Sequence, residues 1–194
     1  MGNPSMQRVR CAERRDAEGV LAIYAPIVRQ TAISFELEPP SLEQMRERIE
    51  STIQRFPWLV GESERGIEGY AYASRHRERA AYQWSADVSV YVAADRRGQG
   101  LGRALYTPLL GMLKDLGYYS ALAGIALPNP ASVRLHEAMG FQPIGIYRNI
   151  GYKLGAWHDV GWWQLKLREY RDEPEPPRMM EQYAGTVEMR ERLR

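Results

Sequence analysis

The chain has 194 residues, of which 44% are hydrophobic and 26% are charged, as is ordinary for one globular domain with its own core. The net charge of +2 is too small to indicate binding to nucleic acid or to a membrane surface. The N-terminal segment lacks the apolar core of a signal peptide, no apolar run is long enough to span a membrane, and the single Cys11 cannot form an internal disulfide. We therefore expect a cytoplasmic protein with no nucleic acid and no membrane among its partners.

The first forty residues predict a strand, a helix and an extended connection. The run at 7–11 is typical of a short strand, and apolar residues at helical spacing follow Asp16, which is placed to cap the helix. Pro26 should kink this helix or mark its last turn. Residues 32–40 are expected to be extended, and they end on two prolines.

The middle of the chain predicts a helix, three antiparallel strands and another helix. Ser41 and Gln44 form a capping box, and the helix that they open must end before Pro57. Apolar runs bounded by turn residues then predict a hairpin and a long third strand, at 58–63, 67–74 and 82–92. A glycine-rich segment follows, and the next helix is expected to run from it to about Leu116.

The remaining part of the domain predicts a strand, a helix and two further strands. A buried strand is expected at 120–127 and a short helix at 129–139, which Gly140 ends as a C-cap. Two closing antiparallel strands are expected at 141–154 and 157–167. This order of elements predicts an α/β (α+β) fold with a mixed, mostly antiparallel central sheet flanked by helices.

The C-terminal segment differs in character from the rest of the chain. We expect one domain over residues 6–168 and a charged, Pro-rich tail over residues 169–194. Two alternatives are open for the tail, a disordered segment or a short amphipathic helix that docks on the domain. The apolar face of such a helix would consist of Met179, Met180, Tyr183, Val187 and Met189.

A glycine-rich turn, "DRRGQGLG" at 95–102, stands between the long strand and the next helix. It is not a Walker A loop, which needs Gly-Lys-Ser/Thr, nor a dinucleotide fingerprint, which needs glycine where Arg103 stands. Glycines allow an anion to approach the backbone, and the free N–H groups and the dipole at a helix N-terminus attract negative charge. By itself the segment fits either an anion site or an ordinary tight turn.

Two blocks of sequence carry a resemblance to a known family. Arg97-x-x-Gly100-x-Gly102 resembles the coenzyme A pyrophosphate loop of GNAT-superfamily acetyltransferases, and "NPASVRLHEAMGFQPIG" resembles the next block of that superfamily. Further segments, among them "AYQWSADVSVYV" and "GYKLGAWHDVGWWQL", look like the phosphinothricin and methionine sulfoximine N-acetyltransferase subfamily. The likeness covers about residues 7–167 and implies the GNAT fold.

The resemblance implies that acetyl-CoA is the cosubstrate, and no metal ion is expected. Backbone N–H groups of the glycine turn would hold the pyrophosphate, and the preceding strand would pair with the pantetheine arm and offer an N–H to the oxyanion. Asn129 fits both a family position near the cofactor and simple helix capping. The expected cofactor-binding residues are Val90, Tyr91, Val92, Arg97, Gly98, Gln99, Gly100, Leu101, Gly102, Arg103, Asn129 and Ser132.

Acetyl transfer to an amine needs a base that removes the ammonium proton before attack. The related enzymes place a glutamate in the "W-x-A-E-x-x-V-Y-V" strand, and this chain has Asp87 there. The side chain is shorter by one methylene, about 1.5 Å, and a misplacement of about 1 Å can cost roughly a hundredfold in rate. A bridging water or a closer strand would restore the reach. The alternative is a carboxylate that only hydrogen-bonds to its neighbours.

Many GNAT enzymes carry a tyrosine acid in the short helix before Gly-Phe, and His136 takes that place here, as it does in the resembled subfamily. With a usual pKa of about 6.5, it could accept the amine proton or return one to the thiolate. A lone histidine on a helix can also be structural. His76 and His158 have weaker claims to a role.

The expected substrate-binding residues match basic and aromatic positions of the subfamily, and they are Phe35, Arg77, Arg79, Tyr82 and, with less support, Lys153. An anionic amino-acid carboxylate or phosphinate would suit the arginines through charge-assisted hydrogen bonds. The four tryptophans Trp84, Trp157, Trp162 and Trp163 are expected in the core.

The favoured interpretation is an acetyl-CoA-dependent N-acetyltransferase that acts on a small amino-acid-like amine by direct attack on the thioester, as a homodimer. Phosphinothricin, methionine sulfoximine and methionine sulfone are the substrates that the resemblance implies. One alternative is a GNAT enzyme for another amine. The other is a GNAT-fold acyl-CoA-binding regulatory module that has lost turnover at Asp87.

Overall fold

A single seven-stranded sheet organises the computed structural model, which describes residues 8–194. The strand order is β1-β2-β3-β4-β5-β7-β6, and every neighbouring pair is antiparallel except β4 and β5. The strands are β1 (Arg8–Cys11), β2 (Trp58–Ser63), β3 (Gly66–Arg75), β4 (Ser85–Val92), β5 (Ser120–Leu127), β6 (Gln142–Lys153) and β7 (Ala156–Lys166). The predicted mixed, mostly antiparallel sheet is confirmed. Residue 7, predicted as the start of the first strand, lies outside the described residues.

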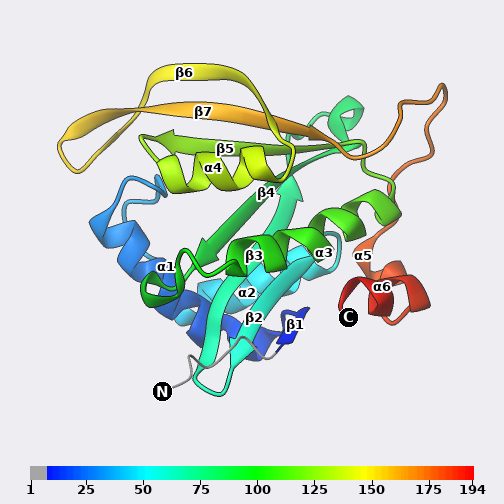
Figure 1. Ribbon diagram of the computed structural model, residues 1–194, viewed down its shortest axis with the longest axis horizontal. Helices are drawn as coiled ribbons and strands as arrows, with labels where there is room; N and C mark the ends of the chain where they lie inside the picture. The colour runs from blue at the N-terminus through cyan, green and yellow to red at the C-terminus, as the bar shows by residue number, and fades with distance from the viewer. Residues whose placement is uncertain (1–7) are drawn as a thin grey trace.

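Helices cover both faces of this sheet, α1 and α2 on one side and α3 and α4 on the other (Figure 1). The helices of the described chain are α1 (Ala17–Gln30), α2 (Leu42–Ile53), α3 (Leu101–Leu116), α4 (Pro130–Ala138), α5 (Met180–Tyr183) and α6 (Val187–Arg192). Each face has its own apolar cluster, because successive strand residues point to opposite sides of the sheet. Within residues 8–194, no helix combines the length and the apolar character that crossing a bilayer requires.

Three local predictions are wrong. The third long strand begins at Ser85 rather than at Tyr82, because hydrogen bonds from Tyr82 and Gln83 close a 3-10 turn at Ala80–Tyr82. Residues 32–40 bend instead of extending, and one cause is the Ser34 hydroxyl, which accepts the N–H of Glu36. Trp157, expected in the core, is 62% exposed on the hairpin that β6 and β7 form.

Helix starts follow the predicted pattern, with one difference in chemistry. Ser41 and Gln44 cap α2 reciprocally, as predicted from the sequence. Asp16 precedes α1, but its carboxylate does not cap that helix. It accepts two hydrogen bonds of 2.7 Å from Arg10 instead, and this ties β1 to the start of α1. Helix α1 continues past Pro26 to its end at Gln30.

The tail takes the docked alternative, as two short helices beside α3 (Figure 1). Met180 and Tyr183 are buried in the same apolar cluster as α3. The guanidinium of Arg192 donates two hydrogen bonds, of 2.8 and 2.9 Å, to the carboxylate of Asp115 on α3. The division of the chain into residues 6–168 and 169–194 stays a prediction, and residues 6 and 7 lie outside the described part.

The sheet opens between β4 and β5. These parallel strands pair only at their starts, and the last pair joins Asp87 to Leu122. Beyond that pair the strands diverge (Figure 1), so the second halves of both present unpaired backbone groups to the space between them. The fold therefore places a site between the two central strands rather than at a sheet edge.

Candidate active site

A cleft of about 480 Å³ lies where β4 and β5 part. Its walls are the backbone of 88–92 on β4, the segment 123–126 on β5, the glycine turn before α3 and the first turns of α4. Unpaired strand backbone on one side and helix N-termini on the other make it suited to an extended ligand that carries an anionic group.

The glycine turn has a backbone that other residues would strain. Gly98 and Gly100 have φ values of +73° and +86°, in the left-handed region, and nothing stands within 4 Å of a Cβ at either position. Gly100 also precedes α3 with no side-chain cap, so the first N–H groups of this 16-residue helix are open. Arg97 and Arg103 line the same cleft. The turn thus combines free space, backbone donors and positive charge.

All the residues expected to bind the cofactor line this cleft except Gln99. Its side-chain amide donates to the carbonyl of Asp95, 3.0 Å away, so it stabilises the turn from outside. Asn129 lines the cleft and also caps α4, since its side chain accepts the N–H of Ser132. Cofactor binding by these residues stays a prediction, which the cleft geometry supports.

His136 lines the cleft from α4 but is only 3% exposed. Nδ1 lies 2.8 Å from the carbonyl of Ser132, so Nδ1 donates, and Nε2 lies 3.0 Å from the hydroxyl of Tyr106 on α3. Burial lowers the pKa of His136 from its usual value, while the bond to Ser132 opposes the shift. A neutral ring of this kind binds its own helix α4 through Nδ1 and joins α4 to α3 through Nε2. The catalytic role expected for His136 stays a prediction.

Asp87 lies at the point where β4 and β5 part, on the face of the sheet opposite to His136. Successive residues of β4 point to opposite faces of the sheet, and Val88 packs on the α3 side. Asp87 therefore points to the other face, as does Tyr91, which packs with its register partner Tyr70 against α1 and α2. The structure therefore does not bring the two residues expected to be catalytic together. Burial raises the pKa of Asp87, and a hydrogen bond and the charges of His76 and Arg77 oppose this shift.

The neighbour of Asp87 is His76, which follows β3. Its Nδ1 lies 2.7 Å from Oδ1 of Asp87, and its ring packs edge-on against Tyr82 and Trp162. Reasoning from the sequence gave His76 a weak claim. The strand register is what indicates that His76 is near Asp87. Ser74 is the register partner of Asp87, and His76, two residues after Ser74, points to the same side of the sheet.

The expected substrate residues fall into two groups. Arg77 and Tyr82 gather near Asp87, with the Arg77 guanidinium 6.0 Å from the Trp162 ring and the Tyr82 ring 5.8 Å from that of His76. Arg79 is exposed just before the 3-10 turn that carries Tyr82.

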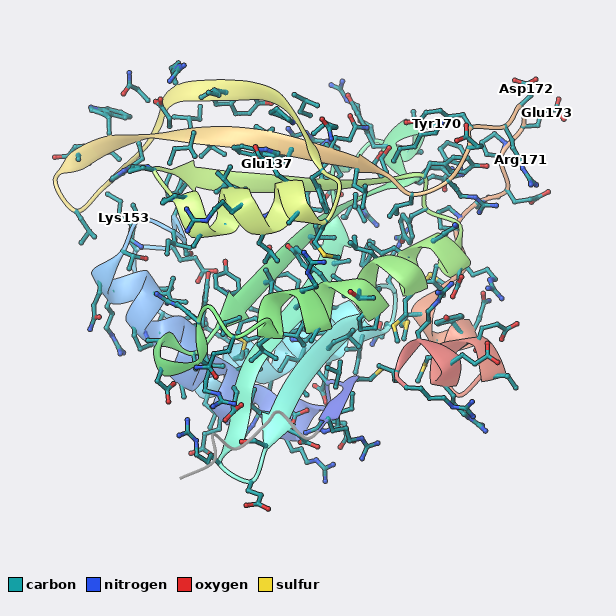
Figure 2. The ribbon with its side chains drawn as sticks, viewed as in Figure 1. Glu137, Lys153, Tyr170, Arg171, Asp172 and Glu173 are labelled. Carbon is teal, nitrogen blue, oxygen red and sulfur yellow. The ribbon has the colours of Figure 1, made fainter. Side chains whose placement is uncertain are left out.

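The other group is at the end of the β6–β7 hairpin, where Lys153 lies beside the loop that follows α1 (Figure 2). Lys153 is buried, and its ammonium donates to the carbonyl of Ser34 at 2.6 Å. Phe35 packs on Gly151, where any side chain would collide with its ring. In this structure these contacts anchor the loop to the hairpin.

A second residue that the sequence did not reveal is Arg96, which lies in the glycine turn and lines the cleft. It is 6% exposed and forms an ion pair of 3.0 Å with Glu68, which is 3% exposed and belongs to β3. The pair fixes the turn to the sheet. No local pattern marks it, because Glu68 and Arg96 meet only once β3 and β4 have paired.

Comparison with known proteins finds similar acetyltransferases. A model of the acetyltransferase (GNAT) domain matches residues 9–162. The chain is 40% identical over 170 residues to the phosphinothricin N-acetyltransferase of Streptomyces viridochromogenes, covering 88% of this chain and 91% of that one. It is 30% identical to the L-methionine sulfoximine/L-methionine sulfone acetyltransferase of Salmonella typhimurium, over 84% and 95% of the two chains.

A solved structure shares the fold as well as the sequence. The GNAT-superfamily phosphinothricin acetyltransferase of Sinorhizobium meliloti, in complex with acetyl-CoA, superposes with a TM-score of 0.81 at 32% identity and covers 89% of this chain and 97% of its own. These similarities extend over the sheet, the cleft and the glycine turn. The chain belongs to the GNAT acetyltransferase family.

Proposed function

We propose that this protein transfers the acetyl group of acetyl-CoA to the amino group of a small amino-acid-like substrate, of the phosphinothricin, methionine sulfoximine or methionine sulfone type. The observation that carries the proposal is the cleft between β4 and β5, with the glycine turn at its mouth. The relatives named for these substrates match more than four fifths of the chain.

The cleft fits the parts of acetyl-CoA. The open space beside Gly98 and Gly100 and the free N–H groups of α3 suit a pyrophosphate, with Arg97 and Arg103 adding charge. After Asp87 the backbone of β4 is unpaired on the side that faces β5, and this suits the amide-bearing pantetheine arm. Bound acetyl-CoA supplies the thioester carbonyl, and a backbone N–H of this strand is the donor that we assign to the developing oxyanion.

The acceptor approaches from the Asp87 side of the sheet. Asp87 is the last residue of β4 that pairs with β5, and its side chain is 28% exposed, so it is open to an incoming ammonium. We assign it the removal of the ammonium proton, after which the nitrogen lone pair would attack the thioester carbonyl directly, with cleavage of the C–S bond and release of the coenzyme A thiolate. Arg77 and Tyr82 lie beside it and suit an anionic group of the acceptor.

We also propose a homodimer formed through the β6–β7 hairpin. β6 is an edge strand, and large apolar side chains on the hairpin are 44–62% exposed, namely Ile144, Ile146, Tyr147, Ile150, Tyr152, Leu154 and Trp157. Apolar surface of this extent at a sheet edge is typical of an interface. Sedimentation should give a dimer, and Ile146→Asp should give a monomer, whereas Leu37→Asp on the loop after α1 should stay dimeric.

The test of the activity is thiol release from acetyl-CoA with a panel of amines. Turnover is expected with methionine sulfoximine, methionine sulfone or phosphinothricin and not with a polyamine, because Arg77 repels a polycation. Asp87→Asn should lower kcat by at least about a hundredfold, and Asp172→Asn on the exposed tail (Figure 2) should not. Tight binding of acetyl-CoA without turnover of any amine would instead identify an acyl-CoA-binding module.

A further inference from the structure

The bond between His76 and Asp87 joins two side chains of different accessibility. Asp87 is 28% exposed and His76 is 12% exposed, so the carboxylate is the more accessible of the two groups. Because an ionised carboxylate only accepts, Nδ1 of His76 carries the proton and donates it to Oδ1 at 2.7 Å. The second oxygen, Oδ2, remains for a ligand.

The imidazole is held in place by aromatic rings on two sides. The Tyr82 ring lies 5.8 Å from it at 72°, and the Trp162 ring lies 5.9 Å from it at 80°. Trp162 is itself fixed against β5, where a Cβ at Gly124 would come within 3.2 Å of the indole. The ring therefore presents Nδ1 to Asp87 in one orientation.

The groups around Asp87 act on its charge in opposite directions. Burial raises its pKa, and the hydrogen bond and charge of His76, followed by the charge of Arg77, lower it. Tyr72 on β3 is a further titratable neighbour, and it is uncharged at neutral pH because burial raises its pKa. His76 is thus the main group that favours the ionised form of Asp87.

We propose that His76 is a positioning residue for acetyl transfer, which holds Oδ1 of Asp87 so that Oδ2 meets the ammonium of the acceptor. This inference rests on the proposed function. In the step that it supports, one proton passes from the ammonium to Oδ2 and the lone pair stays on nitrogen. An aspartate whose carboxylate is fixed by an imidazole can thereby replace the longer glutamate that the resembled strand carries.

Two substitutions separate positioning from other roles. In His76→Asn the side-chain amide can take the place of Nδ1–H, whereas His76→Phe keeps a ring and removes the donor. His76→Phe should lower kcat about tenfold to a hundredfold, and the acidic limb of its pH–rate profile should move to higher pH. His76→Asn should recover most of both. The affinity for acetyl-CoA should not change in either, because His76 does not line the cleft.

A second measurement does not depend on turnover. The carboxyl ¹³C resonance of Asp87, followed by NMR against pH, should titrate at higher pH in His76→Phe than in the unchanged protein. Equal titration midpoints in all variants would overturn the inference, and so would a loss of kcat in His76→Asn as large as in His76→Phe. If the unchanged protein turns over no amine, the proposed function fails, while the NMR titration still decides the coupling of His76 to Asp87.

Discussion

Glu68 and Arg96 form an almost fully buried ion pair that joins the first part of β3 to the glycine turn, with Oε2 and Nη2 3.0 Å apart. Arg96 belongs to the short connection between β4 and α3, so its pairing with Glu68 sets where the turn meets the cleft. Its loss should affect both the stability of the fold and the shape of the proposed cofactor site.

Glu68→Gln should be strongly destabilising, because it removes the buried carboxylate that pairs with the Arg96 guanidinium. We expect the free energy of unfolding to fall by about 3–5 kcal/mol, measured by urea denaturation, together with weaker binding of acetyl-CoA by calorimetry. Glu169→Gln, which breaks the exposed pair with Lys166, serves as the control and should change little. An unchanged urea midpoint for Glu68→Gln would contradict the role of the pair.

Gly100→Ala tests the backbone of the glycine turn. Alanine at φ +86° is strained by roughly 1–2 kcal/mol, although no atom stands in the way of its Cβ. The turn should relax to relieve this strain, so calorimetry should show acetyl-CoA binding at least about tenfold more weakly. Gly145→Ala in β6 is the matched control, since its Cβ also meets nothing within 4 Å and its φ lies outside the left-handed region. Equal affinities in the two variants would argue against a turn that binds through its backbone.

Local sequence patterns were sufficient for most of the fold. Apolar periodicity and caps predicted the strands and main helices, including β5 at Ser120–Leu127 and the capping box at Ser41, and the glycine turn was predicted from its own composition. The prediction of where β4 starts was wrong because hydrogen bonds around Arg79 close a turn, and an alternating pattern does not show where pairing with β3 ends.

The chemistry of the site was less accessible to sequence reasoning, because it depends on contacts between distant segments. His136 resembles a catalytic residue along the chain, yet its partner Tyr106 is thirty positions away on another helix. His76 gains its place beside Asp87 only from the register of β3 and β4. Residue types were therefore predicted, whereas the pairing of side chains had to be seen.

His136 should make the stability of the protein depend on pH. Because burial lowers its folded-state pKa, the unfolded chain binds a proton more readily, and stability is lost as the pH falls below about 6.5. His136→Asn can keep the donor to Ser132 and cannot titrate, so its urea midpoint should change less between pH 7.5 and 5.5. Identical pH dependence in the two proteins would show that His136 is not held neutral.

The tail should contribute to stability rather than to the chemistry. Tyr183 is fully buried beside α3, and its hydroxyl donates to Asp115 at 2.8 Å, where Arg192 also binds. Tyr183→Ala empties a large buried volume and leaves Asp115 with one partner fewer, so the free energy of unfolding should fall by about 3–5 kcal/mol. Val187→Ala, at a position 65% exposed on the same segment, should have little effect. At a temperature where both variants are folded, kcat should equal that of the unchanged protein, since neither residue lines the cleft. A lower kcat would mean that the tail influences the active site through β4. The contact that would carry this influence is the hydrogen bond from the Trp84 indole, just before β4, to the carbonyl of Glu175 in the tail.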